Sequence, residues 1–150
     1  MTQLPDFTLP ATSGTIFQLA AARGKNLVIY FYPKDNTPGC TLESSQFRDL
    51  YPEFQQAGCE VVGISRDSLK SHENFKAKFT LPFALLSDTE ETACNLFGVI
   101  KQKMMYGKQV RGIERSTFVL DQDGALRREW RGLKADGHAA EVLQFVKTLG

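Results

Sequence analysis

Apolar residues run without interruption through residues 27–32, the most hydrophobic stretch of the chain. A short continuous apolar run is typical of a strand that is covered on both faces. Further on, apolar residues within 47–54 recur at the i, i+3, i+4 and i+7 spacing of one helix face. The pattern therefore predicts a central buried strand and then a helix from Cys40 to about Gln56. Pro52 should kink or break that helix.

A second apolar run, at residues 61–65, predicts another buried strand. The order strand, helix, strand implies a parallel pair with a right-handed crossover. The other expected elements are a hairpin from 7–9 and 16–18, a short turn at 20–23, a helix capped at 67–68 and ending near 79, a turn and short strand within 81–86, a helix at 89–97, a strand at 116–120, a return strand at 125–131 and a last helix after Asp136. Residues 101–112 show no clear period and are expected to form a loop that can include an edge strand.

These elements predict an α/β fold. We expect a central mixed β-sheet flanked by helices on both faces, with an N-terminal β-hairpin, in a single domain spanning residues 1–150. The charge is nearly balanced, with 18 Lys and Arg residues against 17 Asp and Glu residues. Because the sequence shows no basic stripe, nucleic acid and membranes are not expected partners. The N-terminus shows no signal peptide, so we expect a cytoplasmic protein, and we expect a monomer.

The chain has three cysteines, Cys40, Cys59 and Cys94, and two histidines. An odd number of widely spaced cysteines does not form a disulfide framework. Without a C-x-x-C pair, a structural zinc site is not expected, and we predict neither a metal nor an organic cofactor. His72 and His138 lie near predicted helix starts and are expected to be solvated surface residues.

Cys40 lies where the predicted central strand has ended and the predicted helix begins. A helix N-terminus favours the thiolate, which is the reactive form of cysteine. Lowering a thiol pKa from about 8.5 to about 6 requires roughly 3.4 kcal/mol, and the helix end supplies at most about 2 kcal/mol. A nearby cation is therefore needed. Arg115, just before the strand at 116–120, is the leading candidate, and Arg66, after the strand at 61–65, is its competitor.

The residues before Cys40 also suit a reactive thiol. The Thr37 hydroxyl can lie beside the sulfur and either donate to it or orient a bound oxygen. Gly39 lets a small substrate approach the backbone closely, and Pro33 is expected to pack on the other side and limit water. The alternative stays open that T-P-G-C is only a turn and that Cys40 is a small core residue.

Several blocks of the sequence resemble one known family, the peroxiredoxins. The blocks are F-Y-P-K-D-N-T-P-G-C-T-L-E, L-P-F-A-L-L-S-D, F-G-V, M-Y-G-K and G-I-E-R-S-T-F-V-L-D. They are most similar to the bacterioferritin-comigratory-protein, or peroxiredoxin Q, branch, and the resemblance runs from Leu4 to about Leu149. It implies a thioredoxin-like fold and a thiol peroxidase that reduces hydrogen peroxide and organic hydroperoxides in antioxidant defence.

The resemblance also assigns roles to individual positions. Cys40 matches the peroxidatic cysteine, and Thr37 and Pro33 match its motif partners. Arg115 matches the arginine near the thiolate, and Glu43 matches a frequent acidic position in the same helix turn. Cys40 would be oxidised by peroxide to a sulfenic acid, which a second thiol must then reduce.

The sequence departs from the family at the positions that supply this second thiol. Many relatives carry a resolving cysteine where this chain has Ser45, and others carry one where it has Lys76. The predicted helix is up to roughly 24 Å long, which places Cys59 out of reach of Cys40. Cys94 is interpreted as a core thiol, but the sequence alone does not exclude it as the resolving cysteine. We therefore expect a one-cysteine cycle with an external thiol, namely thioredoxin, glutaredoxin or glutathione.

Two other functions fit the residues less well. A thiol–disulfide oxidoreductase would need a second cysteine at the position of Thr37 to close its cycle. A redox-sensing or holdase-like binding module would use Cys40 as a switch. Peroxide consumption with dithiothreitol separates these functions, because a sensor reacts once and stalls whereas a peroxidase turns over.

Overall fold

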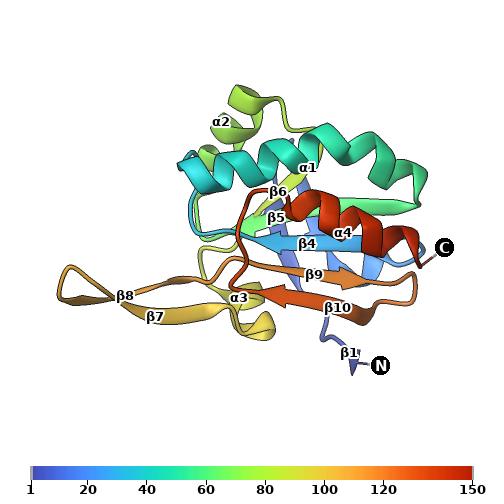
Figure 1. Ribbon diagram of the computed structural model, residues 1–150. Helices are drawn as coiled ribbons and strands as arrows, with labels where there is room; N and C mark the ends of the chain where they lie inside the picture. Colours follow the sequence, from blue (N-terminus) through green and yellow to red (C-terminus); the bar gives the residue numbers. More distant parts are fainter. Residues whose placement is uncertain (1, 150) are drawn as a thin grey trace.

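The computed structural model describes residues 2–149, and its main element is an eight-stranded β-sheet (Figure 1). The strand order across this sheet is β1-β10-β9-β4-β5-β6-β2-β3, and β7 and β8 form a separate two-stranded sheet. The strands are β1 (Thr2–Gln3), β2 (Thr8–Ala11), β3 (Thr15–Gln18), β4 (Asn26–Phe31), β5 (Cys59–Ser65), β6 (Ala84–Ser87), β7 (Ile100–Met105), β8 (Lys108–Ile113), β9 (Ser116–Leu120) and β10 (Ala125–Arg131). The helices are the 3-10 helix η1 (Leu19–Ala22), α1 (Pro38–Gln56), α2 (Leu69–Phe79), α3 (Thr92–Phe97) and α4 (His138–Lys147).

The centre of the sheet agrees with the pattern of the sequence. Every residue of β4 is buried, and β4 pairs in parallel with β5, as the strand-helix-strand order predicted. On its other side β4 pairs antiparallel with β9, so that Phe31 lies between Ile64 and Ser116. The predicted N-terminal hairpin is formed by β2 and β3. The sheet is therefore mixed, as expected.

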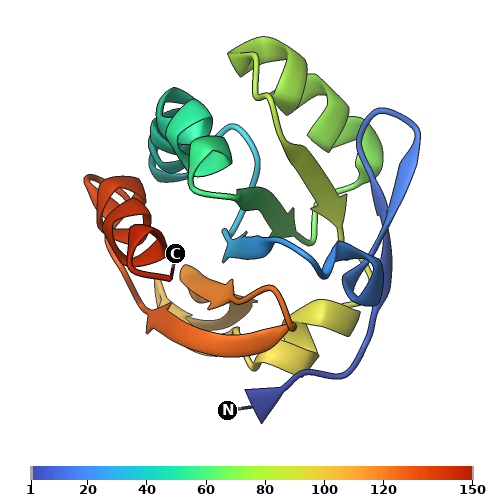
Figure 2. The ribbon, with the colours of Figure 1, turned by 90° about the vertical axis from the view of Figure 1, so that its right-hand side faces the viewer.

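The sheet separates two hydrophobic cores, and β4 contributes to both. Val28 and Tyr30 face a core that includes residues of α1, α2 and α4, whereas Ile29 and Phe31 face a core that includes residues of α3. Figure 2 shows α1, α2 and α4 on one side of the curved sheet and α3 on the other. Helices thus cover both faces, as predicted. Among residues 2–149, no helix is long and apolar enough to span a bilayer.

Helix α1 continues through Pro52, so of the predicted kink or break the break is wrong, and the kink stays a prediction. Proline removes one helical hydrogen bond, which leaves the carbonyl of Arg48 without that donor. Pro52 is exposed, and a carbonyl on the solvent side of a helix can be hydrated instead. The helix therefore tolerates this proline.

Residues 100–113 form a hairpin, so the prediction of a loop at 101–112 is wrong. Only the part of that prediction that allowed a strand within the segment agrees with the structure. Strands β7 and β8 are joined by the two-residue turn Tyr106-Gly107, in which both residues have positive φ, 52° and 77°. Such a turn favours Asn or Asp before the glycine, because most other side chains avoid this conformation. Tyrosine at the first position hid the turn from pattern reasoning.

Both histidines are buried, so the prediction that they lie on the surface is wrong. The His72 Nδ1 lies 2.7 Å from Asp35 Oδ2, and its Nε2 lies 2.9 Å from the Leu86 carbonyl oxygen. The His138 Nε2 lies 2.9 Å from Thr117 Oγ1. The spacing of neighbouring apolar residues in the sequence could have indicated that both histidines are buried. His72 precedes Phe75 by three positions, and His138 precedes Val142 by four, so both share the core face of their helices.

The environment of His138 predicts a loss of stability in acid. Burial lowers the pKa of His138 to about 4, although Glu141 opposes this effect. A depressed pKa in the folded state contributes stability that is present above the unfolded pKa of about 6.5 and is lost as the pH falls through about 4. In His138→Gln, which keeps a hydrogen-bonding side chain but does not titrate, this loss should be smaller by about 2–3 kcal/mol. Urea unfolding at pH 7 and pH 4 measures the difference, and equal losses in the two proteins would contradict the assignment.

Candidate active site

Cys40 is the third residue of α1 and is 1% exposed. Pro38 occupies the first helical position, where the missing N–H costs nothing because no carbonyl lies one turn earlier to accept it. For the same reason, helix geometry leaves the N–H groups of Gly39 and Cys40 without a carbonyl partner one turn back. The start of α1 therefore brings partial positive charge close to the sulfur.

Arg115 lies beside Cys40, because β9 begins where β4 ends. Ser116, the first residue of β9, pairs with Phe31, the last residue of β4. Arg115 therefore lies at the end of these central strands from which the chain continues to α1. The Arg115 Nη2 donates to Cys40 Sγ at 3.4 Å, and Nη1 donates to Glu43 Oε1 at 2.7 Å. One guanidinium thus contacts both the thiol and a carboxylate on the same helix.

Glu43 is fully buried beneath this guanidinium. Its Oε1 accepts from Arg115, and within the described residues its Oε2 is a buried oxygen with no hydrogen-bond partner. Burial raises the pKa of Glu43 to about 7, although Arg115 opposes the shift. Burial alone would lower the pKa of Arg115, but the charges of Glu43 and Cys40 outweigh this and leave it raised. Arg115 therefore stays charged at the sulfur.

Gly39 makes room for the guanidinium. A Cβ atom at this position would lie 3.0 Å from Arg115 Nη2, closer than nearly all real contacts of Cβ atoms. The sequence assigned Gly39 to close approach by a substrate. The structure gives this glycine a second reason, because any side chain would push Arg115 away from Cys40.

The Thr37 hydroxyl does not donate to the sulfur. Its Oγ1 donates to the Lys34 carbonyl oxygen at 2.8 Å, so its single proton is already engaged and only its lone pairs remain available. Thr37 can therefore act toward a bound oxygen only as an acceptor in this conformation. Pro33 is exposed, so its predicted role in limiting water stays a prediction.

Arg66, the competing cation, is engaged elsewhere. Its Nη1 donates to Glu91 Oε2 at 3.0 Å, and its Nη2 donates to the Arg111 carbonyl oxygen at 3.2 Å. Arg66 therefore binds the N-terminal end of α3 and the root of the β7–β8 hairpin. Arg115 is the arginine that the structure brings to Cys40.

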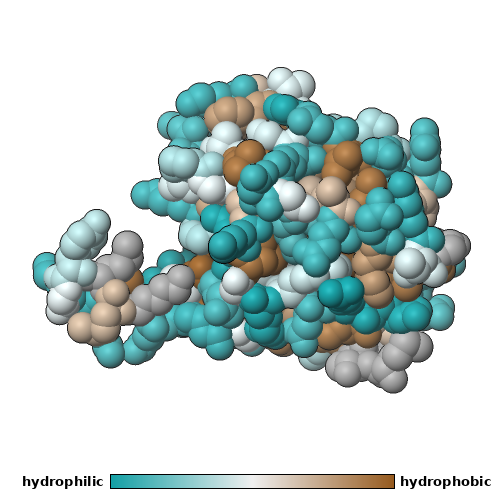
Figure 3. Space-filling model, viewed as in Figure 1, coloured by the Kyte–Doolittle hydropathy of each residue, from teal (hydrophilic) through white to brown (hydrophobic). Residues whose placement is uncertain are grey.

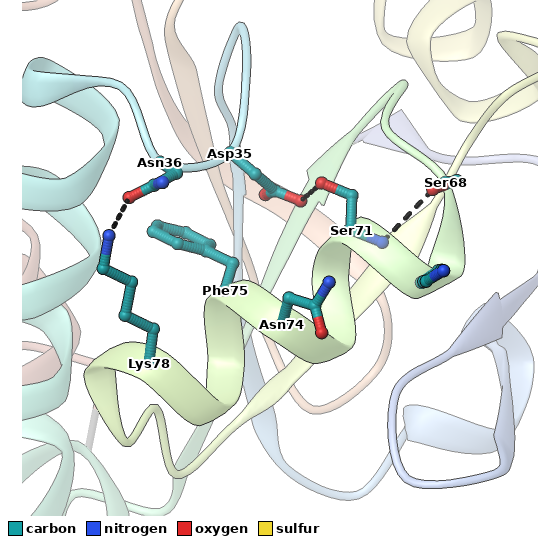
Figure 4. Close-up of a pocket in the computed structure, with 8 residues that line it drawn as sticks. Asp35, Asn36, Ser68, Ser71, Asn74, Phe75 and Lys78 are labelled. Carbon is teal, nitrogen blue, oxygen red and sulfur yellow. Dashed lines mark hydrogen bonds between the residues drawn. The ribbon is translucent and has the colours of Figure 1, made fainter.

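Sequence reasoning missed a polar network that holds the turn before Cys40. Asp35 accepts from the hydroxyls of Tyr32, at 2.6 Å, and Ser71, at 2.8 Å, and its N–H donates to Asp67 at 2.9 Å. A cavity of about 380 Å³ lies between this turn and α2 (Figure 4). The network ties Asp35 to α2. In the sequence, only the spacing of His72 on the apolar helix face pointed to it.

Part of this network has the spacing of a metal site. Ligand atoms of Asp35, Asp67 and His72 lie within 4.8 Å of one another. The His72 Nε2 faces the Leu86 carbonyl, which only accepts, and Nδ1 faces Asp35, so both ring nitrogens already have partners. Hydrogen bonds therefore account for this cluster without a metal ion.

The other two cysteines lie far from Cys40 by topology. Cys59 opens β5 opposite Asn26, at the end of β4 away from the start of α1 and Cys40. Cys94 lies in α3, in the core on the opposite face of the sheet from Cys40. Burial raises the pKa of Cys59 to about 12 and raises the pKa of Cys94 well above its usual range. Neither is prepared to act as a thiolate.

The two positions where relatives carry a resolving cysteine have other surroundings. Ser45 is partly buried in α1. The Lys76 Nζ donates to the carbonyl oxygens of Leu81, at 2.7 Å, and Phe83, at 2.8 Å. Lys76 therefore fastens the end of α2 to the segment that leads into β6.

Comparison with known proteins agrees with this geometry. The sequence model of the AhpC/TSA family matches residues 1–129. The peroxiredoxin Bcp of Xanthomonas campestris is 54% identical over 142 residues, which cover 95% of this chain and 89% of that protein. The peroxiredoxin Bcp of Bacillus subtilis is 45% identical over 145 residues, which cover 97% and 92%.

Solved structures give the same result. The bacterioferritin comigratory protein of Xanthomonas campestris superposes with a TM-score of 0.94 at 50% identity, covering 99% of this chain and 98% of that one. The AhpC of Enterococcus faecalis, at 21% identity, shares the fold with a TM-score of 0.85. The expected thioredoxin-like fold is therefore confirmed. The chain belongs to the AhpC/TSA family, in the bacterioferritin-comigratory-protein branch of the peroxiredoxins, and is a thiol peroxidase.

Proposed function

We propose that Cys40 reduces hydrogen peroxide and organic hydroperoxides in a one-cysteine cycle that an external thiol completes. The contact between the Arg115 guanidinium and Cys40 Sγ, at 3.4 Å, carries this proposal. The structure of the Xanthomonas campestris relative was described in connection with its alkyl peroxide reduction activity, which supports organic hydroperoxides as substrates here.

In the first step, the Cys40 thiolate attacks one peroxide oxygen and the O–O bond breaks. The sulfur becomes a sulfenic acid, and the departing oxygen carries the electron pair and takes up a proton to leave as water or an alcohol. Arg115 and the N–H groups at the start of α1 stabilise the negative charge as it develops on that oxygen. The Thr37 hydroxyl accepts a hydrogen bond from the peroxide O–H and so orients it.

The arrangement of the sheet supports a cycle in which no other thiol of the same chain reduces Cys40. Cys59 is separated from the Cys40 end of β4 by the length of that strand, about 20 Å at 3.3 Å per residue. Cys94 lies across the sheet, and a disulfide requires Cα atoms within about 7 Å. An intramolecular disulfide with Cys40 therefore needs the fold to rearrange.

An external thiol must instead attack the sulfenic acid. Thioredoxin, glutaredoxin and glutathione are the candidate reductants. Because Cys40 is 1% exposed, a bulky thiol reaches its sulfur only after the first turn of α1 has moved. The alternative of a thiol–disulfide oxidoreductase is disfavoured by the same distances, since no second thiol lies near Cys40. The monomeric state and cytoplasmic location stay predictions.

Replacement of the nucleophile tests the assignment directly. Cys40→Ser should fold normally and lose peroxide turnover with dithiothreitol. Cys94→Ser is the matched control, because it also replaces a buried thiol, and it should keep turnover. More than about a tenth of the wild-type rate in Cys40→Ser, a difference of only about 1.4 kcal/mol, would refute the role of Cys40.

Removal of the cation tests its contribution. Arg115→Ala should slow the reaction with peroxide by roughly 10²-fold or more, equivalent to about 2.7 kcal/mol, because the developing charge loses its main stabiliser. Arg66→Ala removes an arginine that binds Glu91 instead and should react at close to the wild-type rate. Stopped-flow fluorescence of the first turnover measures both rates. The opposite ranking of the two variants would show that Arg66 supplies the cation.

Peptide mass mapping tests the one-cysteine cycle. After one equivalent of peroxide, a sulfenic-acid probe should label Cys40, and Cys59 and Cys94 should remain free thiols. Cys59→Ser and Cys94→Ser should each keep turnover with dithiothreitol. A stoichiometric disulfide between Cys40 and Cys94, within one chain or between two, would instead define a two-cysteine enzyme.

A further inference from the structure

Strands β7 and β8 form an arm, residues 100–113, that stands away from the rest of the molecule. Figure 1 shows the arm projecting beyond the main sheet, and Figure 3 shows a hollow between the arm and the body. Among the arm side chains that the structure describes, the buried ones lie at its root, where Ile113 joins the hydrophobic core and Ile100 packs against it. Toward the tip, Met104 is 66% exposed, Tyr106 99% and Val110 38%. Large apolar side chains thus stand in solvent on an element that adds little to the core.

The arm is also strongly basic. Four of the 18 Lys and Arg residues lie in it, at positions 101, 103, 108 and 111, and none of the 17 Asp and Glu residues does. The rest of the chain therefore carries 14 basic residues against 17 acidic ones. The arm concentrates positive charge on a protein whose remainder is slightly negative, and such a surface attracts an acidic partner over roughly 10 Å at physiological salt.

The root of the arm lies next to the active site. Only Glu114 and Arg115 connect β8 to β9, so the arm begins two residues from the guanidinium that contacts Cys40. The Glu114 N–H donates to the Val99 carbonyl oxygen at 2.7 Å, and Arg111 forms an ion pair with Glu91. These contacts fix how the arm leaves the body. Each strand extends about 20 Å, comparable with the radius of a small domain.

From this placement we propose that the arm is the docking surface for an acidic protein dithiol, which reduces the sulfenic acid of Cys40. The inference rests on the proposed one-cysteine cycle, in which the reductant must come to this end of the molecule. A small thiol would occupy only the sulfur, whereas a folded protein approaching Cys40 would lie alongside the arm. Its acidic rim would meet the lysines, and an apolar patch near its thiol would cover Met104 and Tyr106.

The chemistry of the docked complex balances with a dithiol. One partner thiolate attacks the Cys40 sulfur, a mixed disulfide forms, and the sulfenic oxygen leaves as water. The second partner thiol then attacks the mixed disulfide, which releases the Cys40 thiol and leaves the partner oxidised to its disulfide. Cys40 is reduced by two electrons, and the partner is oxidised by two.

A charge-reversed arm tests the proposal. The probe is an acidic thioredoxin, kept reduced by NADPH and its reductase. Lys101→Glu combined with Lys108→Glu should lower kcat/KM for this thioredoxin at least tenfold, and Tyr106→Ala should lower it severalfold. The wild-type rate should fall as salt rises, and the double variant should lose that dependence. Turnover with dithiothreitol, which is neutral and small, should stay within twofold of wild type in every variant.

The matched control reverses two exposed lysines at the far end of the molecule. Lys25 precedes β4 at the end opposite Cys40, and Lys147 lies beside Glu53 near the end of α1. Lys25→Glu combined with Lys147→Glu has the same net charge as the arm variant and should keep the wild-type rate with thioredoxin.

Several results would overturn the docking proposal. Equal loss in the arm and control variants would show only an effect of net charge. If the wild-type enzyme turns over with dithiothreitol but with neither thioredoxin nor glutaredoxin, a protein dithiol is not its reductant and the docking proposal is refuted. A dimer of the wild type that dissociates in the arm variant would assign the arm to a second copy of this chain. Absence of turnover with dithiothreitol as well would instead refute the proposed function.

Discussion

The active site depends on one buried charge arrangement, in which the Arg115 guanidinium lies between the Cys40 sulfur and the Glu43 carboxyl group. Removing a carboxylate and a guanidinium from water costs several kcal/mol for each ion, and their attraction returns this only with good geometry. Among residues 2–149, Glu43 has one hydrogen-bond partner, on one of its two oxygens. Glu43 therefore holds Arg115 in place beside Cys40, and Arg115 and Glu43 act as one unit.

The raised pKa of Glu43 shows what this unit costs. In the folded protein its pKa of about 7 lies above the usual value of 4.5 for a glutamate, because burial outweighs the attraction of Arg115. A raised pKa of this kind contributes stability that is fully present below about pH 4.5 and is lost as the pH rises through about 7. Near neutral pH, burial therefore opposes ionisation of Glu43, and Arg115 only partly offsets that effect. The register that places Ser116 beside Phe31 supplies the rigid support, since it leaves Arg115 no other place to emerge.

The sequence could predict the parts of this site that follow from local pattern. The apolar run before Pro33 and the helical spacing after Cys40 located the thiol at a helix start, and the need for a second positive charge pointed to Arg115. The turn at Tyr106 could not be read, because its conformation is set by hairpin pairing and not by the residue itself. The burial of His72 and His138 was missed although their spacing placed both on the core face of a helix, because their polar partners, Asp35 and Thr117, lie far away in the sequence. Of the two roles predicted for the Thr37 hydroxyl, donation to the sulfur is excluded, because the Lys34 carbonyl three residues away takes its proton. Orientation of a bound oxygen stays a prediction.

In the proposed cycle, the burial of Cys40 separates the reaction with peroxide from the recognition of the reductant. A peroxide presents one small oxygen to the sulfur, whereas a protein thiol cannot reach a residue that is 1% exposed unless the start of α1 opens. The contacts along α1 confine that opening to its beginning. The Thr41 N–H donates to the Thr37 carbonyl in the first turn, and later residues tie α1 to other elements. Glu43 accepts from Arg115, Ser44 Oγ lies 2.8 Å from Tyr30 Oη, and Gln46 contacts Asp136 and Gly137. The first turn can therefore open while the rest of α1 stays anchored. While the first turn of α1 is closed, an approaching reductant finds no exposed sulfur. The residues that distinguish one reductant from another must therefore lie on the surface around the site.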